Sequence, residues 1–485
     1  MKQWYSVAMT DRNHRTLADH LIRPDGQEDL CFATYCPSQG SNRFSGIISE
    51  VIKPFPSERK VHGNVSFSAT YFERALMIAT RRKEGLAFLH SHPFTGWQSM
   101  SPDDIRAEKR LSIGAMSATG LPLLGMTIGS DQTWSARFWG KHPSKRRTYQ
   151  RHICTSVRVV GENLTLSYAP GFLASALNHE TLLRTISAWG EKSQKDLTQL
   201  TIGVVGLGSV GSMVAEILAR TGLTRFVLID FDRVERKNLD RLANVLASEV
   251  GELKVDAVAK GIQRSKTART VTITKIPYSV CEVEGYKAAL DCDVLFSCVD
   301  RPWPRQVLNV IAYAHCIPVI DGGIKVTTNA SNTAMKGADW KTQLVGPGRP
   351  CLEQWGQYTD RLATLERSGD LDDPNYISGM APEDKSIIDA KENVFVFSSH
   401  LASMEVLQLI SLVLAPSGIS NIGQQTYHSK NGTIDIERGV SFTGQSFCQR
   451  LEGKGDTINF SIYGKHPFAE SIRQNARLDR LQTSI

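Results

Sequence analysis

The sequence predicts an α/β protein in which a mixed α/β domain precedes a doubly wound domain with a parallel sheet. Two observations lead to this class. From residue 201 onward, buried strand patterns alternate with helical patterns, which is typical of a parallel sheet covered by helices. The first third also mixes strands and helices, but in a less regular order. The 485 residues, of which 41% are apolar and 22% charged, are ordinary for globular domains and exclude wholesale disorder.

The elements of the first third follow from local patterns. Apolar, partly β-branched runs bounded by turn residues predict strands, and apolar spacing behind a Ser/Thr cap predicts a helix. In chain order we expect strands at residues 30–36 and 46–53, a helix at 68–82, a short strand at 86–89, a helix from 101, and two strands within 122–139.

The second part repeats one pattern, in which a continuous apolar strand is followed by a helix. Residues 346–389 are polar and rich in Gly, Pro and Asp, which predicts a long loop, and residues 393–416 predict a buried amphipathic helix. The last 60 residues show short strand-like pieces and a charged tail. In chain order we expect a helical stretch at 175–195, strands at 201–208 and 225–232 around a helix at 212–222, and strands at 271–277, 293–300 and 317–323.

Composition also limits the setting of the protein. No run of about 18 uncharged apolar residues indicates a membrane span, and the N-terminus lacks the apolar core of a secretory signal. The net charge of +7 is too weak to indicate nucleic acid as a partner. Nine scattered cysteines without a CxxC pair disfavour a disulfide framework and a zinc ribbon, so we expect reduced thiols and a cytoplasmic location.

Two histidines and an aspartate form the first candidate site. His90 and His92 stand two positions apart at the end of a predicted strand, so both imidazoles point to the same face. Asp104 follows 12 residues after His92, at a predicted helix start. Two imidazoles and a carboxylate can hold Zn²⁺ and leave its fourth position to water, as in a catalytic zinc site. The segment from Ser101 to Asp104 is also a good helix N-terminus without any metal.

This cluster resembles the JAMM motif of the JAB/MPN metalloproteases, which cleave peptide or isopeptide bonds after ubiquitin-like proteins. The resemblance implies that His90, His92 and Asp104 bind Zn²⁺. It also implies that Ser101 supports the oxyanion, although the segment between His92 and Ser101 is one residue longer here than in the commonest pattern.

The same resemblance requires a general base. In the family this base is a glutamate on an earlier strand. Glu28, just before the predicted strand at 30–36, fits that position best, and Glu50 is the alternative.

A glycine-rich turn marks the second candidate site. Gly206, Gly208 and Gly211 lie between a predicted strand and a predicted helix. Glycines permit a tight turn there, and the helix N-terminus attracts phosphate. Asp230 ends the next strand, where its carboxylate can bind a ribose hydroxyl. Taken alone, this pattern also fits an NAD site.

The residues that follow favour ATP over NAD. Asp232, Asn238 and Arg241 lie in DFDRVERKNLDR, and Lys254 lies in GELK. Two cations and an amide near a nucleotide suit adenylyl transfer from a triphosphate, because the developing charge needs compensation. Asp300 ends another strand, where a carboxylate suits Mg²⁺. The alternative is that Arg241 and Lys254 are surface residues.

This block resembles the ThiF/MoeB/ubiquitin-activating adenylyltransferase superfamily over residues 178–425. It matches the elements G-x-G-x-x-G, D-x-D-x-V-x-x-x-N-L-x-R, G-x-x-K and V-D-x-x-x-x-R. The resemblance implies a homodimer in which an arginine, here Arg184, reaches the ATP of the partner protomer. It also implies nucleotide contacts from Asp230 and Asn238, phosphate contacts from Arg241 and Lys254, and a metal contact from Asp300.

One cysteine is a candidate nucleophile. Many relatives hold a structural zinc with two CxxC pairs, and at the position of the first pair this chain has Cys351 with Gln354 in place of the second cysteine. Many members also keep, in the loop that begins here, the thiol that takes the carrier C-terminus as a thioester. Cys351 is therefore catalytic, a relic of the zinc site, or incidental. We expect Cys298, inside a predicted strand, to be buried core.

Together, these patterns suggest a bacterial fusion of two enzymes. We expect a JAMM domain at residues 1–168, a ThiF-type domain at 175–425 and a C-terminal extension at 426–485. The first would trim or release a ubiquitin-like protein, and the second would adenylate its C-terminal glycine with ATP and Mg²⁺ and then form a thioester for a conjugating enzyme, in a setting such as antiphage defence. The alternatives are activation of a sulfur-carrier protein for thiocarboxylation, and a scaffold with one inactive half.

Overall fold

The computed structural model describes residues 3–62, 64–142, 144, 148–172, 177–329, 331, 333–372, 377–381, 393–440, 447–459 and 461–482. The chain divides into two compact units. The first consists of residues 1–173 with the short segments 314–316 and 451–459, and the second contains the remainder. Residues 426–485 therefore contribute to both units and do not form a body of their own.

A nine-stranded mixed sheet forms the centre of the first unit, in the order β11-β10-β1-β3-β2-β6-β7-β8-β9. The pairs β1–β3, β1–β10 and β6–β7 are parallel, and the other pairs are antiparallel. A separate hairpin, β4–β5, lies between β3 and the next helix in sequence. The strands are β1 Trp4–Thr10, β2 Leu30–Gln39, β3 Arg43–Ile52, β4 Arg59–His62, β5 Asn64–Phe67, β6 Gly85–Ser91, β7 Leu123–Ile128, β8 Trp134–Lys141, β9 Tyr149–Ile153, β10 Ser156–Val160 and β11 Leu164–Tyr168.

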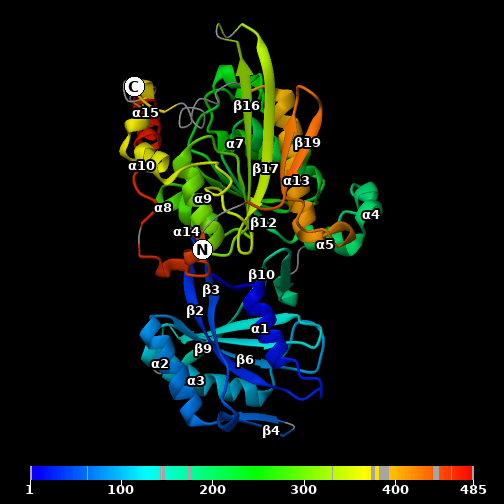
Figure 1. The fold of residues 1–485 in the computed structure, drawn as a ribbon, viewed down its shortest axis with the longest axis vertical. Helices are drawn as coiled ribbons and strands as arrows, with labels where there is room; N and C mark the ends of the chain where they lie inside the picture. Colours follow the sequence, from blue (N-terminus) through cyan, green and yellow to red (C-terminus); the bar gives the residue numbers. More distant parts are fainter. Residues whose placement is uncertain are drawn as a thin grey trace. The chain divides into compact units, whose positions relative to one another are not determined.

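Three helices cover the two faces of this sheet (Figure 1). Helix α1 (Asp11–Leu21) packs against one apolar cluster that includes Leu17, Leu89 and Trp134. Helices α2 (Ala69–Arg82) and α3 (Pro102–Thr119) pack against a second cluster on the other face. Alternate residues of β6 enter the two clusters, so this strand is buried on both faces, which explains its continuous apolar sequence.

The second unit contains an eight-stranded sheet in the order β14-β13-β12-β15-β16-β17-β18-β19. The first five strands are parallel, which confirms the predicted doubly wound sheet, and the last three add an antiparallel extension. The sequence patterns predicted short strand-like pieces in the last 60 residues, but neither β17 nor the antiparallel pairing. The strands are β12 Thr201–Val205, β13 Arg225–Ile229, β14 Thr272–Ile276, β15 Val294–Ser297, β16 Val319–Thr328, β17 Met335–Val345, β18 Gln424–His428 and β19 Thr433–Glu437.

Helices flank this sheet on both sides, with α8 and α9 on one side and α13 on the other (Figure 1). Helix α13 (Phe395–Leu414) is long and apolar enough to cross a membrane, but 56% of its apolar window is buried, and it packs on α6, β16 and β17 as a core helix does. The other helices are α4 Leu183–Trp189, α5 Glu191–Thr198, α6 Ser209–Arg220, α7 Lys254–Ser265, α8 Val283–Ala289, α9 Pro302–Ala314, α10 Asp360–Ser368, α14 Phe447–Leu451 and α15 Pro467–Gln482.

The structure corrects one predicted element. The expected loop at residues 346–389 contains α10, which begins at a Thr359 cap whose hydroxyl accepts a hydrogen bond from the Leu362 N–H and ends at the left-handed Gly369. The Gly and Pro content of the segment masked this short amphipathic helix. Residues 373–376 and 382–389 of the expected loop lie outside the described residues.

Candidate functional sites

The two histidines and the aspartate of the first candidate site converge in the structure. His90 is at the end of β6, His92 follows the strand, and Asp104 is in the first turn of α3. The Nε2 atoms of the two histidines lie 3.2 Å apart, and the Asp104 oxygens lie 3.9 Å from His90 Nε2 and 3.6 Å from His92 Nε2. The edge of a tetrahedron with metal–ligand arms of about 2.0–2.1 Å measures about 3.4 Å. The donor set and its spacing therefore fit a zinc ion.

The surroundings of this cluster keep His90 and Asp104 in their metal-binding forms. Burial and, to a smaller extent, the Arg137 guanidinium lower the pKa of His90 to about 3, so the imidazole is neutral near pH 7. Burial raises the pKa of Asp104, but its contacts with His92, His90 and the Ser101 cap outweigh this effect and hold it well below its ordinary value. Zinc binding requires neutral imidazoles and an ionised carboxylate.

A buried ion pair positions Arg137 behind His90. Arg137 donates to the Glu108 carboxylate from α3 and, through Nη1, to Thr127 Oγ1 at 2.7 Å. The Thr127 hydroxyl lies 3.5 Å from His90 Nε2. Sequence analysis missed all three residues, because nothing local shows that an arginine in β8 and a glutamate in α3 face each other in the core.

Of the two candidate bases, Glu28 lies near the cluster. Glu28 is half-buried, and burial raises its pKa. His92 lowers this pKa by a smaller amount and Asp104 raises it, so the carboxylate lies within electrostatic range of both. The Glu50 carboxylate is 45% exposed and forms an ion pair with Arg82 at 2.7 Å. Position and environment therefore favour Glu28, which stays a prediction as the base.

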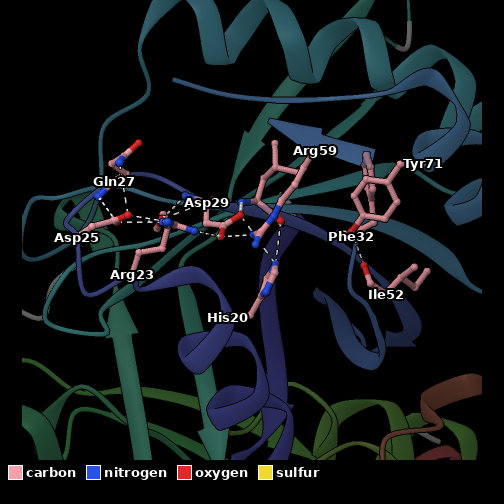
Figure 2. A network of polar contacts seen from close by, with 11 residues as sticks. His20, Arg23, Asp25, Gln27, Asp29, Phe32, Ile52, Arg59 and Tyr71 are labelled. Atoms are coloured by element: carbon pink, nitrogen blue, oxygen red, sulfur yellow. Dashed lines mark hydrogen bonds and ion pairs between the residues drawn. The ribbon is translucent and has the colours of Figure 1, made fainter. Parts of the chain in front are cut away.

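Asp29, next to Glu28, is the centre of a polar network that sequence analysis missed (Figure 2). Its buried carboxylate pairs with Arg59 of β4 and lies 3.6 Å from Arg23 Nη1, and His20 approaches within 4.0 Å. The Asp29 N–H donates to Ser91 Oγ at 2.9 Å, and the Ser91 N–H donates to the Asp29 carbonyl at 3.0 Å. Ser91 separates His90 from His92, so this link joins the segment of Glu28 to the two histidines.

Ser101 has a clear structural role. Its Oγ accepts a hydrogen bond from the Asp104 N–H at 3.1 Å, and its own N–H donates to Asp104 Oδ2 at 2.9 Å. This capping box starts α3 and also orients the Asp104 carboxylate. The oxyanion role of Ser101 stays a prediction.

The second candidate site is a cavity of about 920 Å³ at the carboxyl ends of β12, β13 and β15. Gly206 adopts φ +83°, and a Cβ on Gly211 would lie 1.9 Å from the Gly206 carbonyl oxygen, so the turn between β12 and α6 requires both glycines. Gly208 lines the cavity and has open space around its Cα. A phosphate can therefore approach the N-terminus of α6 closely.

Three carboxylates and a lysine lie together in this cavity. Asp230 accepts hydrogen bonds from the Leu207 N–H at 2.6 Å and from the Asp232 N–H at 2.7 Å, so it holds the glycine turn in addition to lining the cavity. Lys254 Nζ donates to Asp232 Oδ2 at 2.8 Å. Burial lowers the pKa of Lys254, but Asp230, Asp232 and Asp300 outweigh it and raise the pKa, so the ammonium stays charged. The exposed Asp300 offers its carboxylate to a cation.

The remaining predicted nucleotide ligands differ in placement. Asn238 and Arg241 line the same cavity. Arg241 donates to Asp240 and to the Lys237 carbonyl, both at the surface, so its guanidinium can exchange these partners for phosphate. Arg184 is exposed on α4 and does not line the cavity of its own chain. Its predicted contact with the ATP of a partner protomer stays a prediction.

The cysteines are arranged differently from the expectation. Cys351, expected at the start of a long polar loop, is 0% exposed and contacts Cys448. Asn309 holds this region, because its amide donates to Cys448 Sγ at 2.8 Å and accepts from the Leu352 N–H at 3.0 Å. Cys298, expected in the core, is half-buried and lines the nucleotide cavity. The hydrogen bond from Cys448 lowers the pKa of Cys351 to about 7.

Comparison with known proteins finds relatives of the second part of the chain. A family model described as ThiF family matches residues 180–431, just over half of the chain. Ubiquitin-like modifier-activating enzyme 5 of Bombyx mori is 32% identical over 126 residues, 24% of this chain and 31% of that protein. Molybdopterin-synthase adenylyltransferase of Escherichia coli (strain K12) is 28% identical over 145 residues, 30% of this chain and 56% of that protein. The matches thus span less than two thirds of either relative.

Solved structures resemble this chain only distantly. A crystal structure of E. coli MccB with ATP covers 56% of this chain and 76% of its own, at 18% identity and a TM-score of 0.40. A crystal structure of E. coli tRNA N6-threonylcarbamoyladenosine dehydratase, TcdA, covers 50% of this chain and 96% of its own, at 21% identity and a TM-score of 0.34.

Proposed function

Because the chain belongs to the ThiF family, we propose that its second unit adenylates the C-terminal glycine of a ubiquitin-like or sulfur-carrier protein with ATP. The observation that carries this proposal is the single cavity that holds the glycine turn together with the acidic and basic residues expected for adenylyl transfer. The names of the curated relatives, an activating enzyme for a ubiquitin-like modifier and an adenylyltransferase, support this substrate class.

The residues of the cavity have complementary roles in this reaction. A carboxylate oxygen of the carrier attacks the α-phosphorus of ATP, and the bond from that phosphorus to the bridging oxygen breaks, so pyrophosphate leaves with the electron pair. Lys254 and Arg241 compensate the charge on the phosphate oxygens, and the N-terminus of α6 holds the phosphate chain. Asp300 would hold Mg²⁺, which neutralises phosphate charge.

The adenylation proposal is tested with Mg·ATP and a candidate carrier. Isothermal titration is expected to show ATP binding that Asp300→Ala weakens, and carrier-dependent ATP–pyrophosphate exchange should be lost in the same variant. Asp256→Ala is the matched control, because Asp256 forms an exposed ion pair with Lys275 outside this cavity. Tight NAD binding without ATP binding would overturn the proposal.

For the first unit we propose a JAMM-type zinc peptidase that trims or releases the same carrier. The convergence of His90, His92 and Asp104 supports this proposal. These three residues would hold Zn²⁺, which supplies polarisation of the scissile carbonyl and an acidified water. Glu28 would accept the proton from the attacking water and return it to the leaving amine, and Ser101 would donate to the oxyanion.

Metal content and cleavage separate the roles in this unit. His92→Ala is expected to lose zinc, measured by elemental analysis, together with cleavage of a carrier precursor or conjugate. Glu28→Gln should retain zinc and lose cleavage, because an amide cannot accept the proton. Glu50→Gln is the matched control, since Glu50 carries the same group on the next strand. Full activity in Glu28→Gln would remove Glu28 from the mechanism.

The two activities together describe one enzyme that both processes and activates a ubiquitin-like protein, as a cytoplasmic homodimer with a conjugating enzyme as a further partner. We propose antiphage defence as the setting of such a pair. The second candidate is sulfur-carrier metabolism, which the molybdopterin-synthase adenylyltransferase match favours. A thiocarboxylate product, detected by mass spectrometry of the carrier, would identify it.

A further inference from the structure

The nucleotide cavity has one wall that the sequence motifs do not account for. His466, Pro467 and Phe468, from the segment before and at the start of α15, line the same cavity as the glycine turn. These residues lie beyond the region that the family model matches, which ends at residue 431.

The wall is aromatic and continuous. The His466 ring stacks on Trp303, with centroids 5.4 Å apart and planes 2° apart, and lies 5.1 Å from the Phe231 ring. Phe468 meets Phe231 edge-on at 6.0 Å. The Phe468 side chain is nevertheless 60% exposed, so a large apolar face is left open to the cavity.

The topology of the sheet places the base of a bound nucleotide at this wall. The phosphates of a bound nucleotide would lie at the glycine turn after β12, and its ribose would lie at Asp230 at the end of β13. The sheet order β14-β13-β12 continues this line toward β14. Phe231 directly follows Asp230, and Tyr278, Ser279 and Val280, which follow β14, also line the cavity. The base therefore extends away from the phosphates toward Phe231.

The C-terminal segment is held in place before any nucleotide binds. Trp303 Nε1 donates to the Ile462 carbonyl at 2.8 Å, and the Gly464 N–H donates to the Cys281 carbonyl at 2.8 Å. Arg473 of α15 pairs with Glu282. His466 itself caps α15, because its Nδ1 accepts a hydrogen bond from the Ala469 N–H at 3.2 Å. Such pre-organisation lowers the entropy cost of binding.

We propose that Phe231, His466 and Phe468 form the base-binding wall of the ATP site, so that the C-terminal segment is part of the nucleotide site. The inference rests on the proposed ATP-dependent function. Stacking recognises the face of a base and not its hydrogen-bonding edge, so the wall adds affinity for any purine ring and distinguishes a nucleotide from a bare triphosphate.

The test compares Mg·ATP with inorganic tripolyphosphate by isothermal titration on the full chain. Phe468→Ala is expected to weaken ATP binding roughly tenfold. The same variant should bind tripolyphosphate as the wild type does, which also shows that the cavity is intact. Phe468→Trp should retain ATP binding, and its tryptophan fluorescence should respond to ATP and not to tripolyphosphate. Phe55→Ala, at a comparably exposed phenylalanine of the first unit, is the control.

The outcomes separate this inference from the proposed function. If the wild type binds ATP and both Phe468→Ala and Phe231→Ala bind it equally well, the base lies elsewhere and the inference is overturned while the function stands. If Phe468→Ala weakens ATP and tripolyphosphate equally, the residue acts on the cavity as a whole and the inference is again overturned. A wild type that binds neither ligand would overturn both.

Discussion

Ser91 and Asp29 are joined by two hydrogen bonds that run in opposite directions. The Asp29 N–H donates to Ser91 Oγ at 2.9 Å, and the Ser91 N–H donates to the Asp29 carbonyl at 3.0 Å. Ser91 lies between the two candidate zinc-binding histidines, and Asp29 follows the candidate base Glu28. The link therefore sets the distance between the base and the metal ligands. The Asp29 carboxylate is anchored in turn by Arg59 and Arg23, so the geometry of the site depends on a network outside it (Figure 2).

Loss of the Asp29 carboxylate should destabilise the first unit. Asp29→Ala leaves Arg59 without its buried partner, and we expect the free energy of unfolding to fall by about 2 kcal/mol, since Arg59 keeps some contact with water. Denaturant unfolding measures this change. Asp25→Ala is the control, because Asp25 also pairs with Arg23 but is exposed. Equal unfolding midpoints for the two variants would show that the network contributes nothing.

Lys254 should be required for adenylation. It pairs with Asp232 and lies among three carboxylates, where its charge offsets theirs when a triphosphate enters. Lys254→Ala is expected to slow ATP–pyrophosphate exchange roughly a hundredfold, as for the loss of one electrostatic contact to a transition state. Lys275→Ala, which removes an exposed lysine of β14, should leave the rate unchanged. If Lys254→Ala exchanges pyrophosphate at the wild-type rate, Lys254 has only a structural role.

The role of Cys351 as acyl acceptor should be separable from adenylation. Cys351→Ala is expected to retain carrier-dependent exchange and to lose a thiol-sensitive covalent band on a non-reducing gel, because the thiolate is the acyl acceptor. Because Cys351 is buried, the band should form only when its turn opens, and alkylation of the native protein should be slow.

Cys448 provides the internal check on this prediction. Cys448→Ala removes the hydrogen bond that lowers the pKa of Cys351, so the band should persist but form more slowly near neutral pH. A band that survives in Cys351→Ala would move the nucleophile to another cysteine, with Cys448 the first to examine. Adenylation without any band in the wild type would favour sulfur transfer.

The first unit should lose stability in acid through His315. Burial lowers the pKa of His315 to about 3, and its Nδ1 lies 2.7 Å from Ser38 Oγ. In the unfolded chain, the imidazole has the ordinary histidine pKa of about 6.5. Between these values the unfolded state binds more protons, so stability decreases as pH falls, by about 1.4 kcal/mol per pH unit for this group.

The acid prediction is checked by the pH dependence of the unfolding midpoint. His315→Gln should be less stable than the wild type at pH 8 and should show a shallower loss between pH 6.5 and 4. Ser38→Ala, which keeps the imidazole buried, should retain the wild-type slope. If the His315→Gln protein loses stability as steeply with falling pH as the wild type does, buried groups other than His315 cause the loss.

Much of the fold could be predicted from local patterns. Strand–helix alternation predicted the parallel sheet of β12 to β16, and apolar runs predicted β2, β3, β6, β7 and β8. These predictions were possible because the spacing of apolar residues within one segment indicates both its secondary structure and its burial. The glycine turn is a second case, since Gly206 and Gly211 are required by backbone geometry within one short segment. For the same reason, His90 and His92 could be placed on one face of a strand end.

Other features depended on residues that are distant in sequence. The antiparallel pairing of β17, β18 and β19 has no local signature, because it joins segments far apart in the chain. The Glu108–Arg137 pair and the Asp29 network have none either, because each partner is an ordinary polar residue until the fold brings the other to it. Tertiary structure also corrected the two cysteines. Local composition placed Cys351 at the start of a polar loop and Cys298 in the core. Packing against Asn309 and Cys448 buries Cys351, and Cys298 lies at a strand end that lines the cavity.

The sequence by itself therefore determined the fold class of the second unit, its glycine turn and the residues that can bind a nucleotide or a metal, since these depend on residue type and short spacing. Only the tertiary structure decided which carboxylate lies near the histidines, which thiol is accessible, and that His466 and Phe468 reach the same cavity as Gly208. These outcomes depend on contacts between segments far apart in the chain. Such contacts are set by packing of the whole unit and are not encoded in any one segment.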